Sequence, residues 1–176
     1  MVLSTTKEPI HLNCMRKAIR LARLCKPIPT AFCVGCVITI SGTDRIISSG
    51  YSRELDGNTH AEQCAIKKLL DEGEGEGEEE DKTKTEDYRF KYLDLYSTME
   101  PCSVRLSGQV SCSEILIDFN KFNRSNFKIL NIYLGVIEPD DFVRCDGISK
   151  LNESGINVTE VYGISEECLK IARGYF

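Results

Sequence analysis

The sequence of 176 residues has only two histidines, His11 and His60, and no apolar run long enough to span a bilayer. The absence of such a run argues against an integral membrane protein. The first residues lack the charged and then apolar pattern of a secretory signal peptide, so we expect a cytoplasmic protein, with the nucleus as an alternative. Nine cysteines, an odd number, cannot all pair within one chain, and free thiols are typical of a reducing compartment.

Strong basicity is also lacking. The net charge is −5, but residues 72–87 carry nine acidic and two basic side chains, so the rest of the chain has a net charge of +2. That is far below the charge of a dedicated nucleic-acid-binding protein, and it suits a small phosphorylated substrate. The acidic segment is of low complexity, and we predict a disordered loop there, at about residues 72–87, that takes no part in the chemistry.

The remaining sequence alternates between helical and extended patterns and predicts one domain over residues 1–176. Strand–helix–strand connections favour parallel pairing, and the turn at residues 41–44 favours a hairpin. We therefore expect a three-layer α/β/α fold, in which helices cover both faces of a five-stranded mixed sheet. The predicted helices are 11–26, 59–72, one from about 111, 146–155 and 165–175, and the predicted strands are 31–40, 45–52, 92–99, 127–136 and 156–163.

His60 lies at the start of one predicted helix, and Cys112 lies at the start of the next, after a loop that begins near Cys102. Because each helix follows a strand, both helix starts are expected at the same edge of the sheet, where ligands gather in such folds. One imidazole and two thiolates form a three-ligand set for catalytic zinc, which leaves the fourth position to water. The sequence therefore predicts a zinc site made of His60, Cys102 and Cys112.

Glu62 follows His60 by two residues. Residues at this spacing do not share a helix face, but a metal beyond the helix end would let Glu62 reach the bound water. A carboxylate in that place takes a proton from water and passes it to a leaving group, so Glu62 is the predicted catalytic residue. The structural alternative is a capping box formed by Thr59 and Glu62.

Three stretches, GYSRELDGNTHAEQCAI, TMEPCSVRLSG and LGVIEPDDFV, together resemble the fungal-type pyrimidine deaminases of riboflavin biosynthesis. These belong to the zinc-dependent cytidine-deaminase superfamily, whose signature is HxE followed by PCxxC. Here nine residues, not two, separate Cys102 from Cys112, and a long insertion there is similar to the riboflavin branch. The resemblance covers residues 11–175 apart from the acidic segment, and it implies a cytidine-deaminase-like fold, a zinc cofactor and a homodimer.

The resemblance further implies hydrolytic removal of the 2-amino group of 2,5-diamino-6-(ribitylamino)pyrimidinone 5'-phosphate as ammonia. Zinc would activate the water, Glu62 would protonate the ring nitrogen and the departing ammonia, and the backbone N–H of Ala61 would bind the polar edge of the substrate. Two alternatives remain open. One is a related deaminase that acts on a free nucleotide or a tRNA base, and the other is a non-catalytic, zinc-stabilised partner subunit.

Bacterial members of the branch hold the substrate with an asparagine near the first strand and with a histidine and a lysine between the cysteines. This chain has TAFCVG and VRLSG in those places, so these contacts do not transfer. Arginine suits a phosphate through its fork of donors, and glycine allows a close backbone approach to a ligand. The candidate substrate-binding residues are Arg53, Glu54, Asn58, Arg105, Ser107 and Gly35.

The other histidine and the remaining cysteines have simpler interpretations. His11, at the start of the first predicted helix, is expected to be solvated. The CVGC pair, Cys33 and Cys36, does not open a helix and is expected to be buried as small apolar residues rather than to bind a metal. The other cysteines are expected to pack in the protein interior: Cys14, Cys25, Cys64, Cys145 and Cys168.

Overall fold

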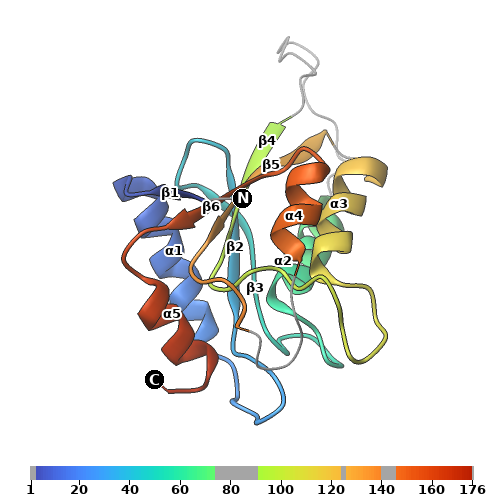
Figure 1. Ribbon diagram of the computed structural model, residues 1–176. Helices are drawn as coiled ribbons and strands as arrows, with labels where there is room; N and C mark the ends of the chain where they lie inside the picture. Colours follow the sequence, from blue (N-terminus) through green and yellow to red (C-terminus); the bar gives the residue numbers. More distant parts are fainter. Residues whose placement is uncertain (1–2, 74–90, 124–125, 140–145, 176) are drawn as a thin grey trace, which may run out of the picture.

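The computed structural model describes residues 3–73, 91–123, 126–139 and 146–175 (Figure 1). Residues 72–73 of the predicted acidic loop complete a helix, and the rest of that loop lies outside the described residues. Cys145 also lies outside them. None of the helices in the described part of the chain combines the length and hydropathy that crossing a membrane requires.

The centre of the fold is a mixed sheet with the strand order β1-β6-β5-β4-β2-β3. Its strands are β1 (Ser4–Thr6), β2 (Gly35–Ile40), β3 (Ile46–Tyr51), β4 (Lys91–Ser97), β5 (Phe127–Leu134) and β6 (Asn157–Val161). Strands β1, β6, β5 and β4 are parallel neighbours, whereas β2 is antiparallel to both β3 and β4. The predicted hairpin is therefore present.

The predicted count of five strands is wrong, because the sheet has six. The additional strand, β1, is only three residues long, and it pairs in parallel with β6 at the edge of the sheet. Its sequence, Ser-Thr-Thr, has no apolar alternation. The pairing depends on the hydrogen-bonding edge that β6 offers, which no local pattern in the sequence reveals.

Helices cover the sheet on both faces, as predicted (Figure 1). Helices α1 (Pro9–Ala22) and α5 (Ser165–Ala172) pack on one face, and α2 (Ala61–Gly73), α3 (Cys112–Phe122) and α4 (Gly147–Glu153) pack on the other. Helix α1 ends at Ala22, four residues before its predicted end. The residues that follow lead along the surface to β2.

Each face of the sheet has its own apolar core. Successive residues of β2 contribute to opposite cores, Val37 on the α1 side and Ile38 on the α2 side. Gly35 brings α1 close to this strand, because a Cβ atom there would lie 2.0 Å from the carbonyl oxygen of Ala18. A close backbone approach therefore exists at Gly35, and its partner in the structure is helix α1.

His11 is buried, in contrast to the prediction. Its side chain is 8% exposed, its Nδ1 lies 2.9 Å from the hydroxyl of Tyr96, and its ring stacks on Tyr133 at 3.9 Å between centroids. Position 11 lies on the face of α1 that packs against the sheet, so the tyrosines replace solvent as partners.

The eight cysteines in the described residues are free thiols, and all of them are buried. This confirms the packing roles predicted for Cys14, Cys25, Cys64 and Cys168. Cys33 and Cys36 are buried as well, with 1% and 0% exposure. Burial raises the pKa of the Cys25 thiol to about 11 and that of Cys168 to about 12, so both remain protonated at neutral pH.

Candidate active site

The starts of α2 and α3 lie at the same edge of the sheet. Helix α2 follows β3 and helix α3 follows β4, and both strands run antiparallel to β2, so their carboxyl ends point the same way. Gly50 on β3 allows α2 to approach, since a Cβ atom there would lie 2.4 Å from the carbonyl oxygen of Ala61. The positive ends of two helix dipoles consequently meet where His60 and Cys112 are found.

The start of α2 differs from the predicted capping box. The hydroxyl of Thr59 donates to the carbonyl of Leu55 at 3.0 Å, and the N–H of His60 donates to Oε1 of Gln63 at 3.4 Å. The helix begins at Ala61, two residues later than predicted. Because Gln63 accepts the hydrogen bond from the N–H of His60, the carboxylate of Glu62 does not cap the helix.

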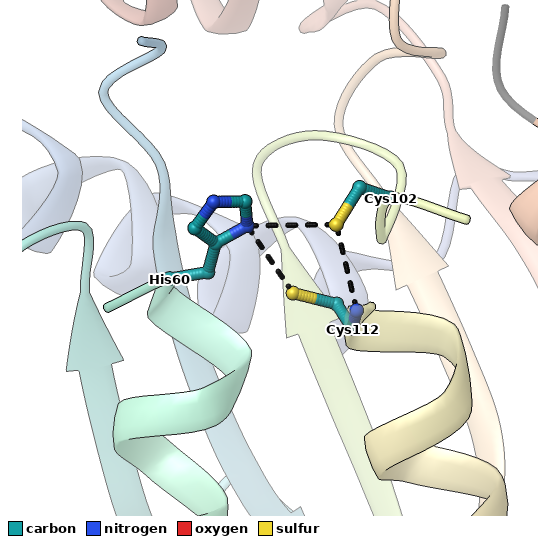
Figure 2. A group of neighbouring side chains, drawn as sticks. All are labelled: His60, Cys102 and Cys112. Carbon is teal, nitrogen blue, oxygen red and sulfur yellow. Dashed lines mark hydrogen bonds between the residues drawn. The ribbon is translucent and has the colours of Figure 1, made fainter. Parts of the chain in front are cut away.

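The start of α3 has a complete capping box. Ser111 is the N-cap residue, its hydroxyl accepts from the N–H of Glu114, and Glu114 accepts from the N–H of Ser111 at 3.1 Å. This fixes Cys112 as the first helical residue. Its side chain therefore points from the helix end toward the neighbouring α2 (Figure 2).

His60, Cys102 and Cys112 converge (Figure 2). Nδ1 of His60 lies 3.5 Å from Sγ of Cys102 and 3.4 Å from Sγ of Cys112, and the three ligand atoms all lie within 4.8 Å of one another. Zn–S bonds of about 2.3 Å and Zn–N bonds of about 2.0 Å in a tetrahedral site separate nitrogen and sulfur by roughly 3.5 Å. The two nitrogen–sulfur distances thus match those of a bound zinc ion.

A hydrogen bond links the two sulfur atoms. A hydrogen bond from the thiol of Cys112, with further help from His60, lowers the pKa of Cys102 to about 4. The same hydrogen bond and burial raise the pKa of Cys112 above its ordinary value. A divalent cation would displace the proton of this hydrogen bond, as metal binding to thiolates generally does.

Glu62 lies beside this group in a cavity of about 140 Å³. Its side chain is 3% exposed, and its Oε1 accepts a 2.6 Å hydrogen bond from the hydroxyl of Ser97 at the end of β4. The cavity combines these polar groups with apolar side chains, which are Ala31, Phe32, Val34, Met99, Val104 and Leu106. A small, flat molecule with polar edges matches that combination.

The predicted substrate-binding residues divide into two groups. Those that line the cavity are Arg53, Asn58, Arg105 and Ser107. Glu54 lies outside it, because its carboxylate accepts from the N–H of Tyr51 and from Lys68, the latter at 2.6 Å. Ala61 and Gly35 also lie outside the cavity lining, since both are packed in the protein interior.

Both cavity arginines bind protein acceptors. Arg105, 8% exposed, donates to the carbonyl of Asn58, to Oε1 of Gln63 at 3.0 Å and to the carbonyl of Val110 at 3.5 Å. It thereby ties the loop between the two cysteines to the start of α2. The guanidinium of Arg53 donates to the main-chain carbonyls of Phe32 and Lys26.

Sequence analysis missed two residues that shape the site. Ser97 holds Glu62. Glu100 accepts from the N–H groups of Glu138 and Ile148 at 3.3 and 3.1 Å, which joins the end of β4 to the segment after β5 and to the first turn of α4. Glu100 precedes the Pro-Cys pair in the sequence, a signal that could have identified it. Ser97 had no comparable signal, because its partner comes from another element.

Comparisons with known proteins agree with this geometry. Residues 9–127 match the family of cytidine and deoxycytidylate deaminase zinc-binding regions. The chain is 40% identical over 176 residues to a Schizosaccharomyces pombe protein named diaminohydroxyphosphoribosylamino-pyrimidine deaminase. That match covers 99% of this chain and 38% of the relative, so the chain spans less than half of the relative's length.

Solved structures are similar over most of the chain. The Rib2 deaminase of Aspergillus oryzae, crystallised in complex with DARIPP, has a TM-score of 0.75 and 32% identity, with 94% of this chain and 91% of that chain covered. A deaminase/reductase of Thermotoga maritima has a TM-score of 0.64 and 25% identity over 94% of this chain and 40% of its own. The chain therefore belongs to the zinc-binding cytidine and deoxycytidylate deaminase family, in the branch that contains the Rib2 deaminases.

Proposed function

We propose that this chain hydrolyses the 2-amino group from 2,5-diamino-6-(ribitylamino)pyrimidinone 5'-phosphate and releases ammonia. The observation that carries the proposal is the position of Glu62, a buried carboxylate in the same cavity as His60 and Cys102. A purely structural zinc site has no need of such a group. The relative named as a diaminohydroxyphosphoribosylamino-pyrimidine deaminase supports the choice of substrate, as do other relatives named as riboflavin biosynthesis proteins.

The proposed roles follow from the positions of the side chains. His60, Cys102 and Cys112 would hold zinc, which, when bound, acidifies a water molecule in its open position. Glu62 would take the two protons of that water in turn, and it would deliver the first to the ring nitrogen and the second to the departing amino group. In the balance, the water oxygen ends on C2 of the pyrimidine, the C2–N bond breaks, and ammonia leaves.

The remaining cavity surface suits the pyrimidine. The side chains of Phe32, Val34 and Met99 offer an apolar wall for a planar ring, and Asn58 and Ser107 offer polar groups for its substituents. Arg53 and Arg105 were expected to read the phosphate. Their guanidinium groups instead have carbonyl partners within the protein, which favours a role in holding the cavity walls.

Ammonia release from the purified, zinc-loaded chain tests the proposal. The ribityl pyrimidine phosphate should be deaminated faster than cytidine, deoxycytidylate or a tRNA base, and Glu62→Gln should abolish most of the release. Faster turnover of cytidine or deoxycytidylate would overturn the substrate assignment. Full zinc content with no ammonia from any of these compounds would indicate a non-catalytic, zinc-stabilised subunit.

We also propose that the chain forms a homodimer in the cytoplasm. Three apolar side chains of the loop between the cysteines are half or more exposed, a surface that a second copy would cover: Val104, Leu106 and Val110. Buried free thiols suit a reducing compartment. Light scattering of the purified chain should give twice the mass of one chain, and a monomeric mass would refute the dimer.

A further inference from the structure

Arg53 has an unusual backbone. Among the described residues it is the one non-glycine residue with a positive φ, 63°. A side chain in this left-handed region costs free energy that glycine would not incur, and such residues concentrate at functional sites. The N–H of Arg53 donates to the carbonyl of Thr59 at 2.7 Å, directly before His60. The strained residue is therefore attached to the turn that carries the predicted metal ligand.

The guanidinium of Arg53 reaches across to the other wall of the cavity. One terminal nitrogen donates to the carbonyl of Lys26 at 2.9 Å and the other to the carbonyl of Phe32 at 3.2 Å. These two carbonyls bracket segment 27–31 between α1 and β2, of which residues 27–30 are exposed. The planar guanidinium has separate donor groups and can bind both ends of such a segment at once. A lysine ammonium is a compact point charge and cannot span both carbonyls in the same way.

From these contacts we infer that Arg53 is a positioning residue, which fixes the wall formed by residues 26–33 relative to His60 and so sets the gap for the pyrimidine ring. The inference rests on the proposed function. Thr30, Ala31 and Phe32 of this wall line the cavity that also contains His60 and Glu62. Movement of Phe32 would change the fit of a flat ring while leaving the metal ligands in place.

The position of this wall determines whether the Arg53 variants change KM or kcat. It contacts the unreactive face of the substrate, so its contribution is the same in the ground state and the transition state, and its loss raises KM rather than lowering kcat. Arg53→Ala, Arg53→Gly and Arg53→Lys should each raise KM on the order of tenfold and change kcat much less. Zinc content should remain at the wild-type level.

A comparison of Arg53→Gly with Arg53→Ala separates the effect of losing the guanidinium from the effect of the backbone strain. Both remove the side-chain hydrogen bonds, but Arg53→Gly also relieves the positive φ, so it should melt at a higher temperature than Arg53→Ala and show the same rise in KM. Arg23→Ala is the matched control. It removes an exposed arginine whose partner is Glu167, at 3.0 Å, and should leave KM unchanged.

Hydrogen exchange followed by mass spectrometry gives a readout that needs no substrate. In all three Arg53 variants, amides of residues 26–33 should exchange faster than in the wild type, and those of α3 should not change. Unchanged exchange in 26–33 overturns the inference, as does a normal KM in Arg53→Gly. A rise in KM for the phosphorylated substrate but not for the dephosphorylated one would show that Arg53 binds the phosphate instead. A wild-type chain that releases no ammonia would overturn the proposed function but not the exchange result.

Discussion

The hydroxyl of Ser97 donates a 2.6 Å hydrogen bond to Oε1 of Glu62. It joins the last residue of β4 to the first turn of α2, and both side chains are almost fully buried, with 0% and 3% exposure. Because one carboxylate oxygen is held in this way, the orientation of the other is defined beside the metal-ligand group. The hydrogen bond would therefore orient Glu62 for the proton transfer that we propose.

Ser97→Ala should lower kcat about tenfold, since Glu62 would lose its orienting partner while keeping its charge. Ser48→Ala is a matched control, because the Ser48 hydroxyl also links a strand to α2, donating to the carbonyl of Ala65 at 2.7 Å away from the cavity. Each variant should lose about 1 kcal/mol of unfolding free energy in urea titrations. Equal kcat values for the two variants would refute the orienting role of Ser97.

Glu62→Gln should reduce kcat by roughly 10²–10⁴-fold, because the amide keeps the shape of the side chain but carries no exchangeable proton of the required acidity. Zinc content by elemental analysis should not change. Glu54→Gln removes a carboxylate that lies outside the cavity, paired with Lys68, and should retain near wild-type turnover. Rapid ammonia release by Glu62→Gln would exclude the proposed proton transfer.

Purified protein should contain about one equivalent of zinc per chain, held by His60, Cys102 and Cys112. The double variant Cys102→Ala, Cys112→Ala should lose it. The double variant Cys33→Ala, Cys36→Ala should retain it, because these two buried thiols are not part of the converging group. Elemental analysis distinguishes the pairs, and zinc retained without Cys102 and Cys112 would disprove the assignment.

Arg105→Ala should lower kcat/KM by the same factor for the phosphorylated and the dephosphorylated substrate. The buried guanidinium holds the loop between the two cysteines through Asn58, Gln63 and Val110. Its loss should therefore loosen this loop equally, whether or not the substrate carries a phosphate. Removing these charge-assisted hydrogen bonds should also cost about 2–3 kcal/mol of unfolding free energy. A decrease in kcat/KM for the phosphorylated substrate alone would instead support the role in phosphate recognition that the sequence suggests.

Gly35→Ala should destabilise the fold by about 2 kcal/mol or more, because its Cβ would lie 2.0 Å from the backbone oxygen of Ala18 and neither backbone yields easily. Gly42→Asn provides the comparison. Gly42 has a φ of +75° and no atom within 4 Å of an added Cβ, and asparagine tolerates this backbone conformation. In thermal melts, the Tm of Gly42→Asn should therefore be well above that of Gly35→Ala.

The sequence by itself determined the layers of the fold and the chemical group at its centre. Long segments of helical or apolar periodicity predicted five strands and five helices, because burial of one face imposes a period that local sequence records. The three candidate zinc ligands were predicted from the same source. His60, Cys102 and Cys112 are the residue types that zinc prefers, and their positions at helix starts after strands imply a common edge.

Only the tertiary structure decided which side chains meet inside the cavity. Thr59 and Glu62 have the spacing of a capping box, yet Gln63 takes the capping role and Glu62 turns to Ser97, a residue 35 positions away. Arg53 and Arg105 look like phosphate ligands in the sequence, yet they donate to acceptors within the protein. These are main-chain carbonyls for both arginines and also Oε1 of Gln63 for Arg105. The reason is physical: periodicity encodes what a segment buries, whereas a hydrogen-bond partner depends on which elements pack together and how closely.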